Sequence, residues 1–162
     1  MLVAVIADTH LPRGTRALPQ SCVERLRSAD LIVHAGDLSS LQFLEELRGH
    51  GATVGVHGNV DEPAVRAVLP AALELDLGGH RVAVIHDAGP RAGRLERLRR
   101  RFPGARAVIF GHSHLPLHER GPDDFQIFNP GSPTQRRRAP RHTMGMALAD
   151  ARGLEFQLVA LD

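Results

Sequence analysis

The chain begins with MLVAVIADTH (residues 1–10), in which an apolar run from Leu2 to Ala7 leads directly into the polar residues Asp8 and His10. A continuous apolar run of this length predicts a strand that is buried on both faces of a mainly parallel sheet. It has neither a basic leader nor a small-residue cleavage site, so we do not expect a signal peptide. We therefore expect polar groups at the carboxyl end of the first strand of an α/β fold.

Strand and helix signals alternate through the first half of the chain. Apolar runs predict further strands at 31–34 and 52–57, and apolar residues at helical spacing predict helices at 19–28 and 40–48, with a short helical turn at 65–69. Ser40 can cap the second of these helices, and Gly49 or Gly51 can end it.

Hairpin signals dominate the second half. Alternating segments predict paired strands at 73–77 with 81–85, 115–119 with 125–128, and 143–149 with 154–161, while a helix at 93–101 and a strand at 105–110 lie between them. Together the two halves predict an α/β fold, a four-layer αββα sandwich of two mixed β-sheets flanked by helices. The length of 162 residues and the hydrophobic content of 43% predict a single domain over residues 1–162.

Composition excludes several classes of protein. No apolar segment approaches the roughly 20 residues that a membrane-spanning helix needs, so we expect a cytoplasmic protein without a membrane partner. Cys22 is the only cysteine, which excludes a disulfide within the chain, and it is expected to be a buried hydrophobic residue. The net charge is +2, and no aromatic residues lie among the arginines of 136–138, so a nucleic-acid partner is not expected.

Polar side chains follow the predicted strands, where loops at the carboxyl ends converge at one edge. Their four imidazoles, two carboxylates and one amide, without a thiolate, suit manganese, iron, zinc or nickel better than calcium. These seven candidates exceed what one ion accepts, so the sequence predicts two divalent ions, with the bridging ligand from a central strand. The candidate metal ligands are Asp8, His10, Asp37 (the bridge), Asn59, His86, His112 and His114.

Glycines stand beside several of these candidates, and a residue without a side chain allows a sharp turn and close approach. In chain order the motifs read DTH (8–10), GD (36–37), GNVD (58–61), HD (86–87) and GHSH (111–114), followed by NPGS (129–132). On these motifs the chain resembles the calcineurin-like metallophosphoesterases, and most closely their small single-domain bacterial and archaeal phosphodiesterase branch. The resemblance covers nearly the whole length.

The resemblance implies a phosphoesterase, a phosphodiesterase or phosphatase, that hydrolyses small phosphate esters by in-line attack of a metal-bridging hydroxide. Manganese is the favoured metal, and nickel, iron, zinc or magnesium also suit the ligands. One ion would be held by Asp8, His10 and His114, the other by Asn59, His86 and His112, with Asp37 between them.

Further roles are expected beside the metal ligands. Asn59 and His86 would also act in catalysis, and Asp61 would orient a ligand or carry a proton to the leaving group. Arg13 follows His10 closely in sequence, so with Asn59 it is the candidate for substrate binding.

Two positions depart from the wider family pattern. Val60 follows Asn59 where many members carry a histidine that protonates the leaving group, so that step has no assigned acid. Asp87 follows His86 where glycine is common, which can change the surroundings of the metal ligands.

Other interpretations remain open. A protein-binding scaffold of the same fold, like the retromer vacuolar-sorting subunit, is the alternative, although such proteins have lost ligand chemistry at one position and this chain keeps His or Asn at every corresponding one. Arginines 136–138 either form a solvated loop or steer an anionic substrate. His34 is interpreted as a core residue or a support for the ligands, and a small homo-oligomer is compatible with the strand pattern.

Overall fold

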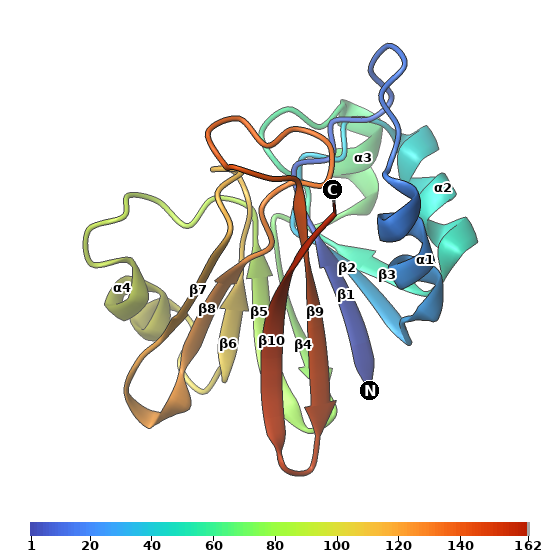
Figure 1. Ribbon diagram of the computed structural model, residues 1–162. Coiled ribbons are helices and arrows are strands. Elements are labelled where there is room, and N and C mark those ends of the chain that lie inside the picture. The colour runs from blue at the N-terminus through green and yellow to red at the C-terminus, as the bar shows by residue number, and fades with distance from the viewer. Residues whose placement is uncertain (162) are drawn as a thin grey trace.

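The computed structural model describes residues 1–161, which form two five-stranded β-sheets packed face to face (Figure 1). Residue 162, the last of the expected domain, lies outside the described part. The first sheet has the strand order β10 (Gly153–Ala160), β9 (Thr143–Asp150), β1 (Leu2–Ile6), β2 (Leu31–His34), β3 (Thr53–Gly55). The second has the order β4 (Ala72–Leu77), β5 (His80–Ile85), β6 (Ala107–Ile109), β8 (Gln126–Asn129), β7 (Leu117–Arg120).

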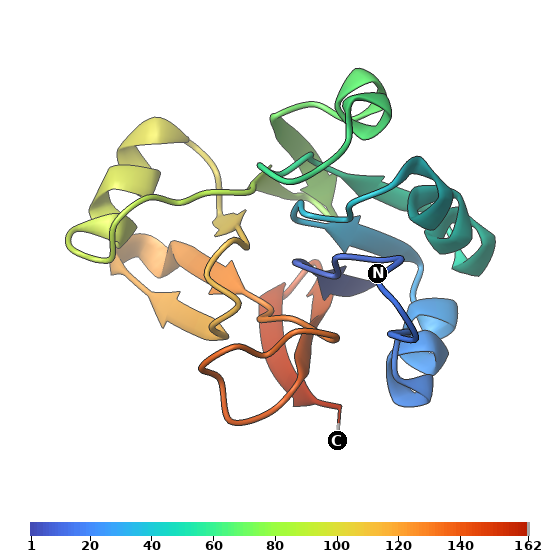
Figure 2. The same ribbon diagram turned by 90° about the horizontal axis from the view of Figure 1, so that it is seen from above.

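Helices cover the outer face of each sheet. The helices α1 (Gln20–Ser28), α2 (Leu41–His50) and α3 (Pro63–Val68) pack against the first sheet, and α4 (Arg94–Arg101) packs against the second. Seen from above, the blue and teal helices and the yellow-green α4 lie on opposite sides of the paired sheets (Figure 2). A short 3₁₀ turn, Pro122–Asp124, connects β7 and β8. The predicted αββα sandwich of two mixed sheets is confirmed.

The alternation of side chains along β1 explains how this strand serves two layers of the core. Val3 and Val5 face the second sheet, whereas Ala4 and Ile6 face the helices, and all four side chains are completely buried. Because side chains alternate between the faces of a strand, a shift of one residue would exchange the two sets. The apolar run at 2–7 therefore forms a central strand with no polar face.

The local signals that delimit α2 act as the sequence indicates. The Ser40 hydroxyl accepts a hydrogen bond from the Phe43 N–H at 3.1 Å, and the Gly51 N–H donates to the Leu47 carbonyl at 3.3 Å. Phe43 and Leu47 are buried against the first sheet, each contributing roughly 1.5–3 kcal/mol through burial of apolar surface.

Strand direction brings distant loops to one edge. The strands β1, β2 and β3 are mutually parallel, and β5, β6 and β8 are parallel in the other sheet, so their carboxyl ends meet at the upper edge in Figure 1. The final hairpin, β9 and β10, returns to the first sheet and pairs antiparallel with β1.

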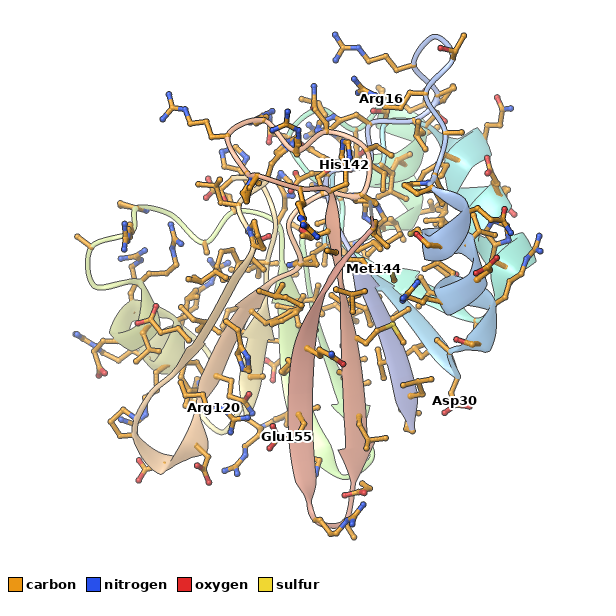
Figure 3. The ribbon with its side chains drawn as sticks, viewed as in Figure 1. Arg16, Asp30, Arg120, His142, Met144 and Glu155 are labelled. Carbon is orange, nitrogen blue, oxygen red and sulfur yellow. The ribbon has the colours of Figure 1, made fainter. Side chains whose placement is uncertain are left out.

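A further link joins the sheets near the opposite end. Arg120 of β7 and Glu155 of β10 face each other in Figure 3 and form an ion pair. No helix within residues 1–161 has the length and hydropathy that crossing a membrane requires.

Candidate metal centre

Candidate metal ligands from both sheets meet at this upper edge. They lie just beyond the ends of β1, β2, β3, β5 and β6. The structure brings six of them together in two groups, and within each group the possible ligand atoms all lie within 4.8 Å of one another: Asp8, His10 and His114 in the first, and Asp37, His86 and His112 in the second. The seventh, Asn59, contacts the second group through its amide oxygen.

The backbone at these residues is strained. Left-handed φ angles between 48° and 69° occur at five of the candidate ligands, namely Asp8, His10, Asp37, His112 and His114. For residues with a Cβ, this conformation costs roughly 1–2 kcal/mol each, and such strain gathers at functional sites. The sequence analysis did not anticipate that these five candidate ligands share a left-handed backbone.

The first group is enclosed. Asp8 and His114 are fully buried and His10 is 8% exposed. The His114 Nε2 lies 3.2 Å from the His10 Nε2 and 3.6 Å from the Asp8 Oδ1. Its other nitrogen, Nδ1, lies 2.5 Å from the Gln135 carbonyl, which can only accept, so Nδ1 carries the proton. The Nε2 lone pair of His114 therefore faces His10 and Asp8, as in a metal ligand oriented from behind.

The second group is open to solvent on one side. The His86 Nε2 lies 3.1 Å from the Asn59 Oδ1, and the His112 Nδ1 lies 3.0 Å from that same oxygen. The His86 Nδ1 donates to the Ala35 carbonyl at 2.8 Å, which again directs Nε2 inward. Asn59 and His112 are exposed, whereas His86 is buried.

Asp37 lies between the two groups. Its Oδ2 is 3.3 Å from the His86 Nε2 and 3.8 Å from the His10 Nε2, while its Oδ1 accepts a hydrogen bond from the Val60 N–H at 3.0 Å. One carboxylate oxygen thus faces a histidine of each group. This is the position that a carboxylate shared by two ions requires.

Burial sets the charge state of the first group. It raises the pKa of Asp8 to about 7 and lowers the pKa of His114 to about 4 and that of His10 below its ordinary value. The Asp8 Oδ2 is buried without a hydrogen-bond partner in the described part of the chain. Because an uncompensated carboxylate oxygen is costly, a cation fits this group, and its unprotonated imidazoles and hard oxygen suit a divalent metal.

Asp37 behaves in the opposite way. Burial alone would raise its pKa, but the hydrogen bond and charge of His86 outweigh burial and bring the pKa down to about 2. Burial likewise lowers the pKa of His86, but the hydrogen bond to Asp37 and its charge raise it overall. The central carboxylate is therefore ionised at neutral pH.

Two glycines allow the ligand side chains to approach. A Cβ at Gly58 would lie 2.1 Å from the Asp37 Oδ1, and one at Gly36 would lie 2.6 Å from the His86 Nδ1. No side chain fits at either position. These glycines serve the close approach of the neighbouring ligands.

Asp61 connects the loops that follow β2 and β3. Its Oδ2 accepts from the backbone N–H of Asp37 at 3.0 Å and of Gly58 at 2.7 Å, and its Oδ1 accepts from Ser39 at 2.6 Å. The carboxylate is 4% exposed. This geometry fixes the loop that carries Asp37 against the loop that carries Asn59.

The loop at 130–142 closes over the first group. The Ser132 hydroxyl donates to the Asp8 carbonyl at 2.8 Å and the Thr134 hydroxyl donates to the Thr9 carbonyl at 2.6 Å. The NPGS motif therefore belongs to a clamp that joins β8 of the second sheet to the end of β1.

Two arginines near the candidate ligands, Arg13 and Arg137, differ in their surroundings. The Arg13 side chain is exposed and, within residues 1–161, forms no hydrogen bond or ion pair with a candidate ligand. Arg137 instead lies within electrostatic range of the first group, because its charge lowers the pKa of Asp8 and of His114. The loop at 11–18 projects away from the fold (Figure 1), and contact of Arg13 with a substrate stays a prediction.

His34 is a buried support. Its Nδ1 accepts from the Gly36 N–H at 3.1 Å, and its Nε2 lies 3.0 Å from the Thr9 hydroxyl. Burial lowers its pKa to about 3. The ring therefore stays neutral and positions the loops after β1 and β2, whose ligands are Asp8 and Asp37.

Comparisons with known proteins identify sequences that resemble this chain over most of its length. A model of the calcineurin-like phosphoesterase superfamily domain matches residues 1–152. The protein named "Probable metallophosphoesterase MJ0623" from Methanocaldococcus jannaschii is 33% identical over 165 residues, which cover 100% of this chain and 82% of that relative.

Solved structures share the fold at lower identity. Vps29 of Entamoeba histolytica complexed with Zn²⁺ superimposes with a TM-score of 0.77 at 21% identity, covering 100% of both chains. An archaeal phosphodiesterase gives a TM-score of 0.75 at 21% identity, covering 99% of this chain and 100% of that one. At this identity the similarity shows the fold alone.

Proposed function

Because this chain belongs to the calcineurin-like phosphoesterase superfamily, we propose that it hydrolyses small phosphate esters, with a preference for diesters, at a pair of divalent metal ions. The observation that carries the proposal is the position of the Asp37 Oδ2, which faces a histidine of each ligand group. We further propose that one domain of residues 1–162 performs the reaction in the cytoplasm, with manganese as the favoured metal.

The candidate ligands would hold two ions. Asp8, His10 and His114 would hold one ion, Asn59, His86 and His112 the other, and Asp37 both. Divalent ions held there supply Lewis acidity toward water and toward the phosphoryl oxygens. Asn59 and His112 are exposed at the open side, where an ester can enter beside His86, while Asp61 holds the loops of Asp37 and Asn59 in register.

Val60 limits the leaving group. Its backbone N–H is used by Asp37, and its side chain, 50% exposed, carries no proton to donate. We therefore expect esters with acidic leaving groups, such as p-nitrophenol, to react faster than those that release an alkoxide.

The test is turnover by protein freed of metal with a chelator and then supplied with Mn²⁺, Ni²⁺, Mg²⁺ or Zn²⁺. Bis-p-nitrophenyl phosphate and p-nitrophenyl phosphate are the substrates. Asp37→Asn should lower kcat/KM by at least about 100-fold, the scale of removing one preorganised electrostatic group. The control Asp76→Asn changes an exposed carboxylate near the end of β4, which accepts a hydrogen bond from the Gly79 N–H, and should retain activity. Absence of metal-dependent turnover by the native protein on both esters would reject the proposal.

The second candidate is a non-catalytic, protein-binding scaffold, which the similarity to the Vps29 fold favours. The two functions differ in one result. A scaffold would bind metal in calorimetry and show no turnover on either ester.

A further inference from the structure

A pocket of about 240 Å³ lies beside the open ligand group. Asn59 and His86 form one side of it, and both belong to the candidate metal centre. The rest of the wall includes two arginines from different helices, Arg66 of α3 and Arg101 of α4, together with His57 and Asp87. A molecule held at Asn59 and His86 can therefore extend into this pocket.

Arg66 is fixed in place by the loop that carries a candidate ligand. Its Nε donates to the Asp61 carbonyl at 2.9 Å, and one terminal nitrogen donates to the Asn59 carbonyl at 2.6 Å. Both acceptors are neutral carbonyls, and within residues 1–161 no carboxylate lies within 4.0 Å of this guanidinium, so its positive charge is not compensated there. A guanidinium has five N–H donors in a planar fork, and the remaining ones are available to a carboxylate or phosphate.

Arg101 brings a second uncompensated charge. Its guanidinium lies over the Phe102 ring, 5.1 Å from the ring centroid, and within residues 1–161 it has no carboxylate within 4.0 Å. Its neighbours differ, because Arg99 pairs with Asp123 and Arg100 pairs with Glu96. Among the three arginines of the last turn of α4, Arg101, which has no ion pair in the described part of the chain, lines the pocket.

The charge balance of the wall favours an anion. Against the two guanidinium groups stands one carboxylate, Asp87, whose Oδ1 accepts a hydrogen bond from the Gly89 N–H at 2.7 Å. The histidines of the wall, His57 and His86, add no fixed negative charge. The volume lies below the roughly 300–1,000 Å³ of sites that enclose a whole small molecule, so the pocket suits one part of a ligand.

We propose that this pocket is a subsite for a second anionic group, a phosphate or a carboxylate, carried by the same substrate whose ester lies at the metal centre. The inference rests on the proposed phosphoesterase function for the position of that ester. It restricts the substrate class to doubly charged molecules in which the second anion is a few bonds from the reacting phosphorus.

Matched probes test the subsite. Thymidine 5′-(p-nitrophenyl phosphate) is compared with its 3′-phosphate and its 3′-carboxymethyl ether, all with the same reacting ester. We expect kcat/KM to be about tenfold higher for at least one doubly charged probe, since hydrogen bonds to charged groups contribute about 1.5–3 kcal/mol. The 3′-phosphate and the 3′-carboxymethyl probes distinguish the two anions.

Arg101→Gln should reduce this preference about three- to tenfold, and Arg100→Gln, the adjacent helix position outside the pocket, should retain it. Arg66→Gln tests the second guanidinium, and loss of preference in either pocket variant supports the subsite. Equal kcat/KM for all three probes in the native protein would overturn the inference, as would an undiminished preference in both Arg101→Gln and Arg66→Gln.

Binding separates this inference from the catalytic one. Calorimetry compares thymidine 3′,5′-bisphosphate with thymidine 5′-monophosphate on native, Arg101→Gln and Arg100→Gln proteins. Tighter binding of the bisphosphate that Arg101→Gln weakens would support the subsite even in a protein that hydrolyses no ester. Equal binding of the two nucleotides would reject the subsite whether or not the protein is active.

Discussion

The two ligand groups differ in how much of each is closed off from water. In the first, Asp8 and His114 are completely buried beneath the loop at 130–142, whereas in the second Asn59 and His112 are exposed. Among the described residues, the Asp8 Oδ2 of the first group is buried without a hydrogen-bond partner, while in the second group Asn59, His86 and His112 contact one another. Asp37 belongs to both environments.

This difference assigns the groups different tasks. An enclosed group with an uncompensated carboxylate gains most from a bound cation, because water cannot replace the cation there. An open group leaves room for a substrate and adjoins the arginine pocket. The first group is therefore suited to retaining a metal ion, and the second to holding a metal ion that a substrate can reach.

The largest effect that separates the groups is expected for Asp8→Asn. Folded Asp8 has a pKa of about 7 against an ordinary value of 3.8, so between those values the folded state holds a proton that the unfolded chain has released. The free energy of unfolding of the metal-free protein therefore falls by up to about 4 kcal/mol as the pH rises through this range. At pH 8, Asp8→Asn should stabilise the metal-free protein by up to that amount and should reduce the stabilisation that Mn²⁺ gives. Urea unfolding with chelator and with Mn²⁺ measures both.

Buried histidines give the opposite slope and do not obscure this result. His34 and His114 have folded pKa values of about 3 and about 4, so below pH 6.5 the unfolded chain takes up protons first and stability falls as pH falls. The native protein and Asp8→Asn share this loss of stability, so the difference between their free energies of unfolding reports on Asp8 alone. A variant that is destabilised equally with and without metal would contradict the assignment.

Asp61→Asn should have a smaller effect than Asp8→Asn, and we expect it to weaken metal binding at the second, open ligand group. The variant keeps one acceptor oxygen in place of two, and its NH₂ group would face a backbone N–H that Asp61 now accepts. We expect the affinity for one of two Mn²⁺ ions to fall about 10- to 100-fold, as for other supports of metal ligands. Calorimetric titration with Mn²⁺ resolves the two ions, with Asp76→Asn as the control, and two unchanged affinities would show that the loops hold without Asp61.

The smallest effect concerns the clamp over the buried group. Thr134→Val removes the hydrogen bond to the Thr9 carbonyl and should cost about 1 kcal/mol of stability with a modest loss of metal affinity. Thr53→Val removes a comparable bond, from its hydroxyl to the Gly51 carbonyl, at a distance from the site. Equal metal affinity in both variants would show that the clamp does not support the ligands.

Much of the fold follows from local patterns. Apolar periodicity and turn signals located each strand and each α-helix found within residues 1–161, and the capping signal at Ser40 was confirmed. The sheet to which the last hairpin returns was not predictable, because β9 and β10 carry the same alternation whichever partner they take. That β9 pairs with β1 depends on the packing of the entire sandwich.

The candidate site was only partly accessible from sequence. Residue types and strand ends indicated which side chains converge, because parallel strands end together. The left-handed backbone at Asp8 and His10, the triple hydrogen bonding of Asp61 and the proximity of Arg137 depend on loop conformation, and residue type does not determine this. For the same reason the sequence could not show that the Arg13 side chain is exposed on a projecting loop, and its contact with an anion stays a prediction.

The distribution of the candidate ligands over the two sheets also has a mechanical consequence. In each ligand group the acidic side chain extends from the first sheet, while at least one histidine, His114 or His86, extends from the second. An ion bound by either group would cross-link the two sheets at their upper edge. At the opposite end, the exposed ion pair of Arg120 and Glu155 connects them. Metal uptake and the rigidity of the whole molecule would then be a single property.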